Sequence, residues 1–488
     1  MKTKMKTLVA AITLLIMLSF AVTPSYANSR APYWEGTDSN GVIFKEGDVP
    51  IEVESELLTF DIPTLPYNSY RSGEYFLEYD SKVTAEYTFY NPTDMTITAT
   101  LLFPFGEKPE YSNLIDKDKN NLSEAELNKY DVTVNGQPIE KRIRHTYKNS
   151  STNIFDADEH IASLSDEYLI KENITPDTPV TKYTYTVSGV ERRYVKESTL
   201  KEHSNVKIHF NIPAGDRIII ENDTNINAGI NKDGYHFVSY KLEATSASFS
   251  FYVIGESYPA PSTELIYYTD YDRGSSKIKG EIKESTESMT LEELFLSNYD
   301  EASGVSKVDW YNAAISELTF GVNNQMHHWS AGFPRLIRWY EYQITIGPGE
   351  KITNSVTAPI YPSINNFHSP VQYEYTYLLS PASGWADFGR LDIVINTDYE
   401  MNDSNLEGFK KTENGYKLTR DGLPKDAEGN YIDLRFSLLN DGNTPLEQPN
   451  PNLFFRFLEG VGDVLLFLLF GTFILISGAI TWIVSLFR

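Results

Sequence analysis

Apolar and polar residues alternate along most of the chain between residues 50 and 440, with the period of two that is typical of strands with one buried face. The clearest example is residues 83–105, where two alternating runs flank a polar turn, Asn91-Pro92-Thr93-Asp94. One face of the two runs consists of Val83, Ala85, Tyr87, Phe89, Ile97, Ala99, Leu101, Phe103 and Phe105. We expect a hairpin with one buried side here.

Similar runs follow at 130–134, 180–187, 206–212, 217–221 and 235–254. Turn signals such as Asn135-Gly136 separate them. Many short strands joined by turns predict a mainly β fold of the sandwich type.

Helical periodicity interrupts this pattern around residues 156–169 and again at 290–319. In the second stretch apolar residues recur three and four positions apart. They are Leu291, Leu294, Phe295, Trp310, Ala313, Ala314 and Leu318. We expect this stretch to be an inserted helical layer.

Strand periodicity resumes near residue 335, with Tyr340, Tyr342, Ile344 and Ile346 on one face. A later strand carries a tyrosine ladder at 373, 375 and 377. An exposed ladder would stack on sugar rings or dock a partner, whereas a buried ladder would belong to the core. The buried interpretation is favoured because the same face continues into Leu379.

These patterns predict a fold of two β-sandwich-like domains with a helical insertion between them. The expected division is a signal peptide at 1–27, an N-terminal strap at 28–49, a first β-sandwich region at 50–260, a helical insertion at 261–330, a second β-sandwich region at 331–439, a linker at 440–463 and a transmembrane helix at 464–486.

The two apolar ends predict the location of the protein. Three lysines precede an apolar run at 8–20, and Ser25 and Ala27 are the small residues of a signal peptidase site, so we expect cleavage after Ala27. Nearly every residue of 464–486 is apolar, and this length spans a bilayer core. We expect a single-pass protein of the cell membrane, with an extracellular N-terminal ectodomain and a cytoplasmic C-terminus.

Composition narrows the classes of partner and chemistry. The formal net charge is −25, which disfavours nucleic acid as a partner. The chain has no cysteine, which excludes disulfides, metal thiolates and thiol catalysis. An exported, cysteine-free chain with a predicted C-terminal anchor favours the outer face of a Gram-positive cell.

Two stretches carry a resemblance to known families. The stretch VTAEYTFYNPTDMTITATLLFPF, followed by NGQPIE, resembles domains of the vault and inter-alpha-trypsin type. Together with YEYTYLLSPASGWADFGRLDIVI, it is also similar to a domain-of-unknown-function family of exported, membrane-anchored, β-rich bacterial proteins. The resemblance implies a fold and a location, but no activity, because these motifs contain no catalytic residue.

One loop has the residue types of a calcium site. Asp116, Asp118, Asn120 and a closing Glu126 place oxygen atoms at alternate positions, as in an EF-hand loop shortened by one residue. The alternative is that Ser123 and Glu126 form a capping box at the start of a short helix. Calcium is the one cofactor for which we find candidate ligands.

The predicted membrane helix has small residues along one face. Gly471, Gly478 and Ser485 recur every seven residues, a spacing that lets helices approach closely in lipid. This would support an oligomer or a membrane partner. Glycine is frequent in such helices in any case, which is the alternative explanation.

The sequence favours a non-enzymatic ectodomain that binds an envelope glycan or protein. We find no nucleophile elbow and no zinc-protease motif. Two alternatives stay open: a cell-envelope glycan hydrolase that uses unidentified carboxylates, and a subunit of a membrane complex. The sequence does not decide whether the protein is an enzyme, but it favours a protein that is not one.

Overall fold

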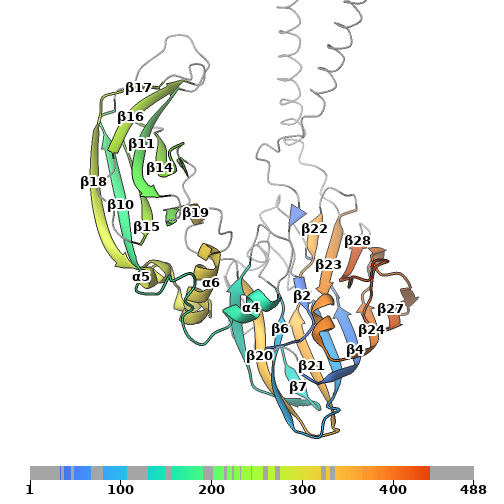
Figure 1. Cartoon of the computed structure of the whole chain (residues 1–488). Helices are drawn as coiled ribbons and strands as arrows, with labels where there is room; N and C mark the ends of the chain where they lie inside the picture. The colour runs from blue at the N-terminus through green and yellow to red at the C-terminus, as the bar shows by residue number, and fades with distance from the viewer. Residues whose placement is uncertain are drawn as a thin grey trace, which may run out of the picture.

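The computed structural model describes residues 33–34, 38–45, 49–66, 81–106, 130–148, 157–190, 202–213, 217–221, 225–230, 232–242, 244–255, 262–269, 275–319, 326–329, 336–365, 368 and 370–439. These residues form five β-sheets and three α-helices (Figure 1). The prediction of a mainly β fold is confirmed. No helix in these ranges is long and apolar enough to cross a membrane. The signal peptide at 1–27, the linker at 440–463 and the helix at 464–486 lie outside the described residues, and they stay predictions.

Three sheets form one packing unit, which we call the main β-unit. The largest is an eight-stranded sheet with the order β26-β27-β24-β4-β5-β21-β7-β8. Its strands are β26 (Lys410–Thr412), β27 (Gly415–Asp421), β24 (Phe388–Asn396), β4 (Glu52–Asp61), β5 (Lys82–Tyr90), β21 (Lys351–Pro359), β7 (Val132–Val134) and β8 (Gln137–Pro138).

The two smaller sheets of the main β-unit contain six and four strands. The six-stranded sheet contains β1 (Tyr33–Trp34), β22 (Ser363–Asn365), β23 (Gln372–Leu378), β28 (Leu434–Leu439) and β25 (Glu400–Ser404) in this order, with β2 (Asp38–Asn40) also paired to β23. The four-stranded sheet has the order β3 (Ile43–Phe44), β6 (Ile97–Pro104), β20 (Leu336–Ile346) and β9 (Lys141–Tyr147).

One continuous apolar core holds these three sheets together. Alternate residues of the strands point into it, as the period of two predicts. Across the core, the ring of Phe60 in the eight-stranded sheet meets the rings of Tyr377 and Phe436 in the six-stranded sheet, at centroid distances of 5.9 and 5.2 Å. The tyrosine ladder at 373, 375 and 377 is buried, with 3% of Tyr373 and 0% of the other two exposed. The buried interpretation of the ladder is therefore confirmed.

The hairpin expected at 83–105 is wrong in its pairing, although its buried faces are as predicted. Strand β5 pairs with β4 and β21, whereas β6 pairs with β3 and β20. The two strands thus lie in different sheets and face each other across the core. The buried side chain of Asn91 stabilises the connection, because its Nδ2 donates to the carbonyl oxygens of Met95, Ile346 and Gly347 at 2.7, 3.1 and 3.0 Å.

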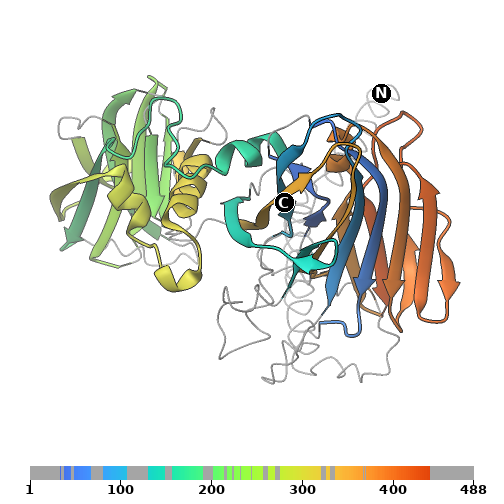
Figure 2. The same ribbon diagram turned by 90° about the horizontal axis from the view of Figure 1, so that it is seen from below.

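Two five-stranded sheets form a second unit, the inserted β-unit, beside the main β-unit (Figure 2). One sheet contains β18 (Glu281–Thr290), β10 (Pro179–Ser188), β15 (Ala247–Ile254), β12 (Arg217–Glu221) and β19 (Met326–Trp329), and the other contains β13 (Ile226–Ile230), β14 (Tyr235–Leu242), β11 (Glu202–Pro213), β16 (Ser262–Thr269) and β17 (Ser275–Lys277). A separate apolar core, with stacked rings such as Tyr240 on Phe249, fills the space between them.

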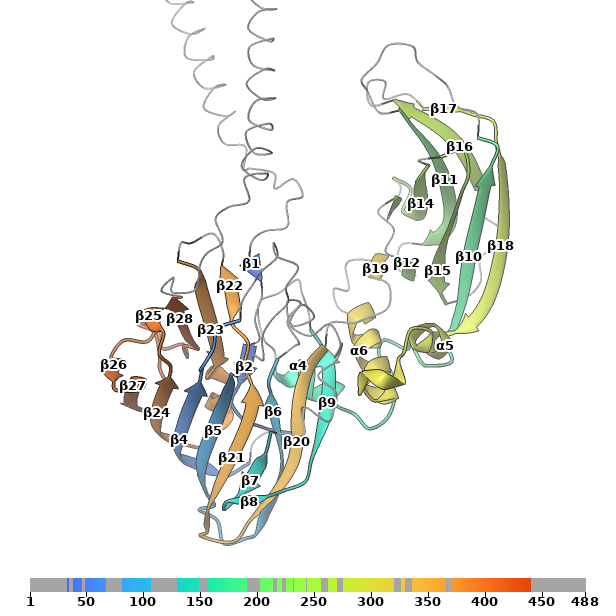
Figure 3. The ribbon, with the colours of Figure 1, turned by 180° about the vertical axis from the view of Figure 1, so that it is seen from behind.

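Helices α4 (Ala157–Ser163), α5 (Leu291–Leu296) and α6 (Lys307–Thr319) lie between the two units (Figure 3). Helix α5 begins with a capping box, in which Thr290 Oγ1 accepts from the Glu293 N–H and the Glu293 carboxylate accepts from the Thr290 N–H. The apolar residues noted above at helical spacing in 290–319 are all buried. Helical structure in this stretch is therefore confirmed.

Strands that are far apart in the sequence pair in the same sheets, so the sheets do not follow the order of the chain. Strands from the expected sandwich regions 50–260 and 331–439 share sheets, for example β4 with β24 and β6 with β20. Residues 262–290 of the expected helical insertion include β16, β17 and β18, and the helices of that region occupy 291–319. Residues 179–290 thus lie between two halves of the main β-unit in the chain.

Candidate functional site

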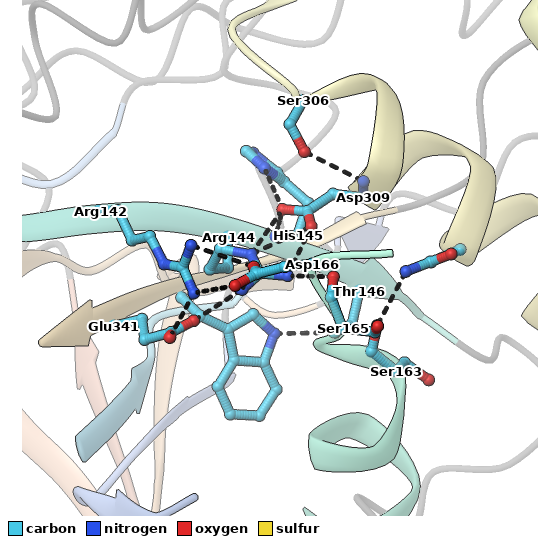
Figure 4. A network of polar contacts seen from close by, with 12 residues as sticks. Arg142, Arg144, His145, Thr146, Ser163, Ser165, Asp166, Ser306, Asp309 and Glu341 are labelled. Carbon is cyan, nitrogen blue, oxygen red and sulfur yellow. Dashed lines mark hydrogen bonds and ion pairs between the residues drawn. The ribbon is translucent and has the colours of Figure 1, made fainter. Parts of the chain in front are cut away.

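Several buried polar and charged side chains gather where helix α6 meets the four-stranded sheet (Figure 4). Strand β9 is the edge strand of this sheet and pairs with β20, and their register places Arg142 opposite Glu341 and Arg144 opposite Trp339. These four side chains share the face that points away from the main core, because partners in an antiparallel pair point to the same side. Helices α4 and α6 cover that face. We call this region the junction.

Arg144 is the centre of the junction. Its Nε donates to both carboxylate oxygens of Asp309 on α6, at 3.0 and 3.2 Å, and its Nη1 donates to Glu341 Oε2 at 2.7 Å. Its Nη2 donates to the carbonyl oxygen of Ser165 at 2.7 Å. The side chains of Arg144, Asp309 and Glu341 are only 5%, 1% and 7% exposed. One guanidinium therefore ties a strand, a helix and a loop together.

Further charges surround this centre. Arg142 donates to Glu341 Oε1 at 2.6 Å, and Lys45 donates to the same atom at 3.3 Å. Asp166, which is largely exposed, forms ion pairs with Arg142 and Arg144 at 3.0 and 3.1 Å. Three cations thus face three carboxylates. Burial alone would raise the pKa of Glu341, but the hydrogen bond from Arg142 and the positive charges of the three cations outweigh it and lower this pKa.

Helix α6 is positioned so that Asp309 reaches the edge of the sheet. Ser306 caps the helix by accepting from the N–H of Asp309 at 3.0 Å, so the aspartate lies in the first turn. Its carboxylate accepts from the backbone N–H of His145 at 2.8 Å, an edge donor that no strand partner satisfies. Burial raises the pKa of Asp309, while Arg144 and this N–H act in the opposite direction.

His145 is buried beside two guanidinium groups. Burial, reinforced by the charges of Arg338 and Arg144, lowers its pKa to about 3, so the imidazole is neutral at physiological pH. Its Nδ1 has no hydrogen-bond partner among the described residues. The histidine therefore adds bulk to the junction without adding charge.

A second polar cluster joins α4, α6 and the loop between α4 and β10. Lys171 Nζ donates to Ser316 Oγ at 3.0 Å, and Ser163 Oγ lies 3.4 Å from Ser316 Oγ. Asn312 accepts from the N–H of Leu169 at 2.9 Å. Burial lowers the pKa of Lys171. A serine beside such a lysine is a residue pair that can serve as a nucleophile and its base. However, Ser316 is 4% exposed and donates its proton to the carbonyl oxygen of Asn312 at 2.7 Å. This arrangement stabilises the helix packing.

The contacts of the junction are those of a rigid structural interface. Each buried carboxylate oxygen of Asp309 and Glu341 accepts from a guanidinium or an N–H. A carboxylate in such contacts has its lone pairs occupied and its geometry restricted. Since removal of one partner would leave a buried charge uncompensated, the contacts hold the inserted β-unit in a defined position on the main β-unit.

A third polar feature crosses the core of the main β-unit. Glu56, Tyr87 and Asn354 are neighbours in one row of the eight-stranded sheet, on its inner face. The Tyr377 hydroxyl donates to Glu56 Oε1 at 3.5 Å, and the Tyr342 hydroxyl donates to Asn354 Oδ1 at 2.8 Å. All five side chains are buried.

The structure does not place the site residues expected from the sequence. The calcium-like loop with Asp116, Asp118, Asn120 and Glu126 lies outside the described residues, as do Gly471, Gly478 and Ser485. Within the described ranges, no group of three or more His, Asp or Glu side chains is arranged to hold a metal ion. The calcium site and the helix-packing face stay predictions.

Sequence reasoning missed the charged residues of the junction and Glu56 and Asn354 of the polar row, although it placed Tyr87 on a buried face. For Glu56 a signal exists: it occupies the same strand face as Leu58 and Phe60, where an apolar residue is expected. For Arg142 and Arg144 the signal is weaker, because alternating charges on a strand are usually a solvated face. Only the packing of α6 shows that this face is buried.

The fold and these sites define the class of protein as a mainly β chain with several sheets and few helices. No protein-family model matches the chain, and no curated protein matches it. Among solved structures, the crystal structure of a candidate nutrient-binding protein from Legionella pneumophila is similar over 84% of this chain and 72% of that chain, at 10% identity and a TM-score of 0.33. A likeness this distant carries no argument about function, and it assigns no family.

Proposed function

We propose that this protein is a single-pass membrane protein whose ectodomain lies outside the cell and binds another envelope component, a glycan or a protein, without catalysing a reaction. The predicted signal peptide and C-terminal apolar segment support the location. The proposed partners are the membrane, through the C-terminal helix, and the envelope component, through the ectodomain. No nucleic acid is proposed as a partner.

The junction is the observation that carries the proposal. Arg144 of the main β-unit is held by Glu341 of β20 in the same sheet and makes a buried contact to Asp309 of α6. Apolar residues of α6 pack on strands β10, β12 and β15, so the contact to Asp309 joins the inserted β-unit to the main β-unit. A surface whose parts are already held in place loses less conformational entropy when it binds a partner. A rigid joint between two β-units is therefore suited to recognition by surfaces on both.

The test is cross-linking in cells followed by affinity purification of the full-length protein. Three forms are compared: the natural protein, a form with an unrelated membrane helix, and Arg144→Met. Arg390→Met serves as the matched control, because Arg390 pairs with Asp392 on the exposed face of β24. We expect partners to be retained with the foreign helix and with Arg390→Met and to be reduced with Arg144→Met.

Two results would contradict the proposal. Partners lost with the foreign helix alone would assign recognition to the membrane segment, as in a subunit of a membrane complex. Release of soluble glycan fragments from purified cell envelopes by the natural protein would show a hydrolase. Asp309→Asn, which keeps the shape of the side chain, replaces Arg144→Met if the latter does not accumulate.

A further inference from the structure

Residues 38–45, which lie within the N-terminal strap expected at 28–49, cross from one sheet of the main β-unit to another. From here on, the strap means these described residues, 38–45. Its first strand, β2, pairs in parallel with β23 of the six-stranded sheet. Its second strand, β3, pairs with β6 of the four-stranded sheet. Lys45 at its end reaches Glu341 of the junction. The strap thus contacts the core, both smaller sheets and the junction.

The strap lies directly over the polar row of the core. The backbone N–H of Val42 donates to the Tyr87 hydroxyl at 3.1 Å, and this hydroxyl lies 3.4 Å from that of Tyr377. A Cβ atom on Gly41 would lie 3.4 Å from the Tyr87 hydroxyl and 4.0 Å from the Tyr377 hydroxyl. Since Tyr377 donates to Glu56, a chain of hydrogen bonds runs from the strap to the carboxyl group.

Among the described residues, no cation acts on Glu56. The titratable groups that face it are the phenols of Tyr87 on β5 and Tyr377 on β23, and Tyr342 of β20 acts in turn on Tyr377. Glu56 Oε2 has no hydrogen-bond partner among the described residues. The same holds for the buried Oγ of Ser39, which stands opposite Tyr377 in the register of β2 and β23.

The charged form of this carboxyl group is therefore costly while the strap is closed. Burial raises the pKa of Glu56 to about 7, and the hydrogen bonds from Tyr87 and Tyr377 only partly oppose this. Below that pH the group holds its proton and is neutral. Above it, the proton passes to solvent and leaves an uncompensated charge in the core, and movement of the overlying strap would let water reach that charge.

We propose that the strap is a pH-dependent latch, closed over the core while Glu56 is protonated and released more often once Glu56 is ionised. The closed strap covers the edges of β23 and β6, and its release would expose both. This device is independent of the proposed binding function, because it concerns the main β-unit alone.

The test is hydrogen–deuterium exchange of the full-length protein in detergent micelles, at pH 5 to 8, with rates corrected for the intrinsic chemistry of exchange. If the pKa returns to its ordinary value of 4.5 when the strap opens, the opening constant for residues 38–45 should rise about 70-fold between pH 5 and pH 8. Residues 132–138, the β7–β8 hairpin, should not change and serve as an internal reference.

Two variants make the result decisive. Glu56→Gln should keep the strap equally protected at both pH values, whereas Glu54→Gln, on the exposed face of the same strand, should behave like the natural protein. A pH-independent strap in the natural protein, or the same pH dependence in Glu56→Gln, would overturn the proposal. If Glu56→Gln does not fold, Tyr377→Phe provides the test: loss of its hydrogen bond should move the midpoint of release to higher pH, and an unchanged midpoint would contradict the latch.

Discussion

The strongest quantitative expectation concerns Arg144 and Asp309 at the junction. Arg144→Met removes the donor to both oxygens of Asp309 and leaves that carboxylate, 1% exposed, with the N–H of His145 as its remaining described donor. Removing one member of a buried, hydrogen-bonded ion pair costs about 3–5 kcal/mol. Glu341 keeps Arg142 and Lys45, so we expect the lower half of that range.

A double variant distinguishes the free energy lost when one partner is left unpaired from the net contribution of the ion pair to stability. Arg144→Met combined with Asp309→Leu leaves no buried charge at this position without its partner, and apolar replacement of a buried pair is often close to neutral. The double variant should therefore be more stable than the sum of the two single effects predicts, by at least about 1.5 kcal/mol.

The assay is urea unfolding, followed by tryptophan fluorescence. One of the six tryptophans, the buried Trp339, lies at the junction and donates from its Nε1 to Thr146 beside Arg144. Arg390→Met removes an exposed arginine on β24 whose partner Asp392 keeps Lys417 and Thr419, so it should leave the midpoint nearly unchanged. The reasoning would be refuted if Arg144→Met were no more harmful than Arg390→Met. It would also be refuted if the two single effects simply added.

Three further predictions follow from other sites. His145 stays neutral in the folded protein down to about pH 3 but binds a proton below about pH 6.5 in the unfolded chain, so its contribution to stability is present above pH 6.5 and is lost as the pH falls. Between pH 7.5 and pH 4.5 this loss amounts to about 3 kcal/mol, and His145→Asn should reduce the difference in guanidinium midpoint between these two pH values. An equal difference in both proteins would contradict this. Gly389→Ala should cost about 1–3 kcal/mol, because its Cβ would collide with the carbonyl oxygen of Glu54, whereas Gly384→Ala meets nothing within 4 Å and should leave the melting temperature unchanged. Similar melting temperatures for the two variants would show that β24 can move away from β4. In the predicted membrane helix, Leu in place of both Gly471 and Gly478 should abolish cross-linking between helices if that face packs, and unchanged cross-linking would exclude such packing.

Strand faces could be predicted from the sequence, but strand partners could not. The alternation at 83–89 and 97–103 correctly identifies the side chains that enter the core. A period of two reports which side of a strand is apolar, and it does not distinguish a hairpin from two strands that face each other across a core. On one side, β5 pairs with β21 and β6 with β20, and both of these partners lie more than 200 residues further along the chain.

The sequence by itself determined the mainly β class, the buried tyrosine ladder and the helical stretch at 290–319, because each depends on a periodicity that is local to the chain. The tertiary structure alone decided that Arg144 meets Asp309 and that Glu56 lies beneath the strap. A charged residue looks the same in sequence whether its face is solvated or covered. The roles of Arg144 and Glu56 depend on the element that packs over each of them. Helix α6 comes from a distant part of the chain, and the strap, although near Glu56 in sequence, is held in place by pairing with β23 and β6.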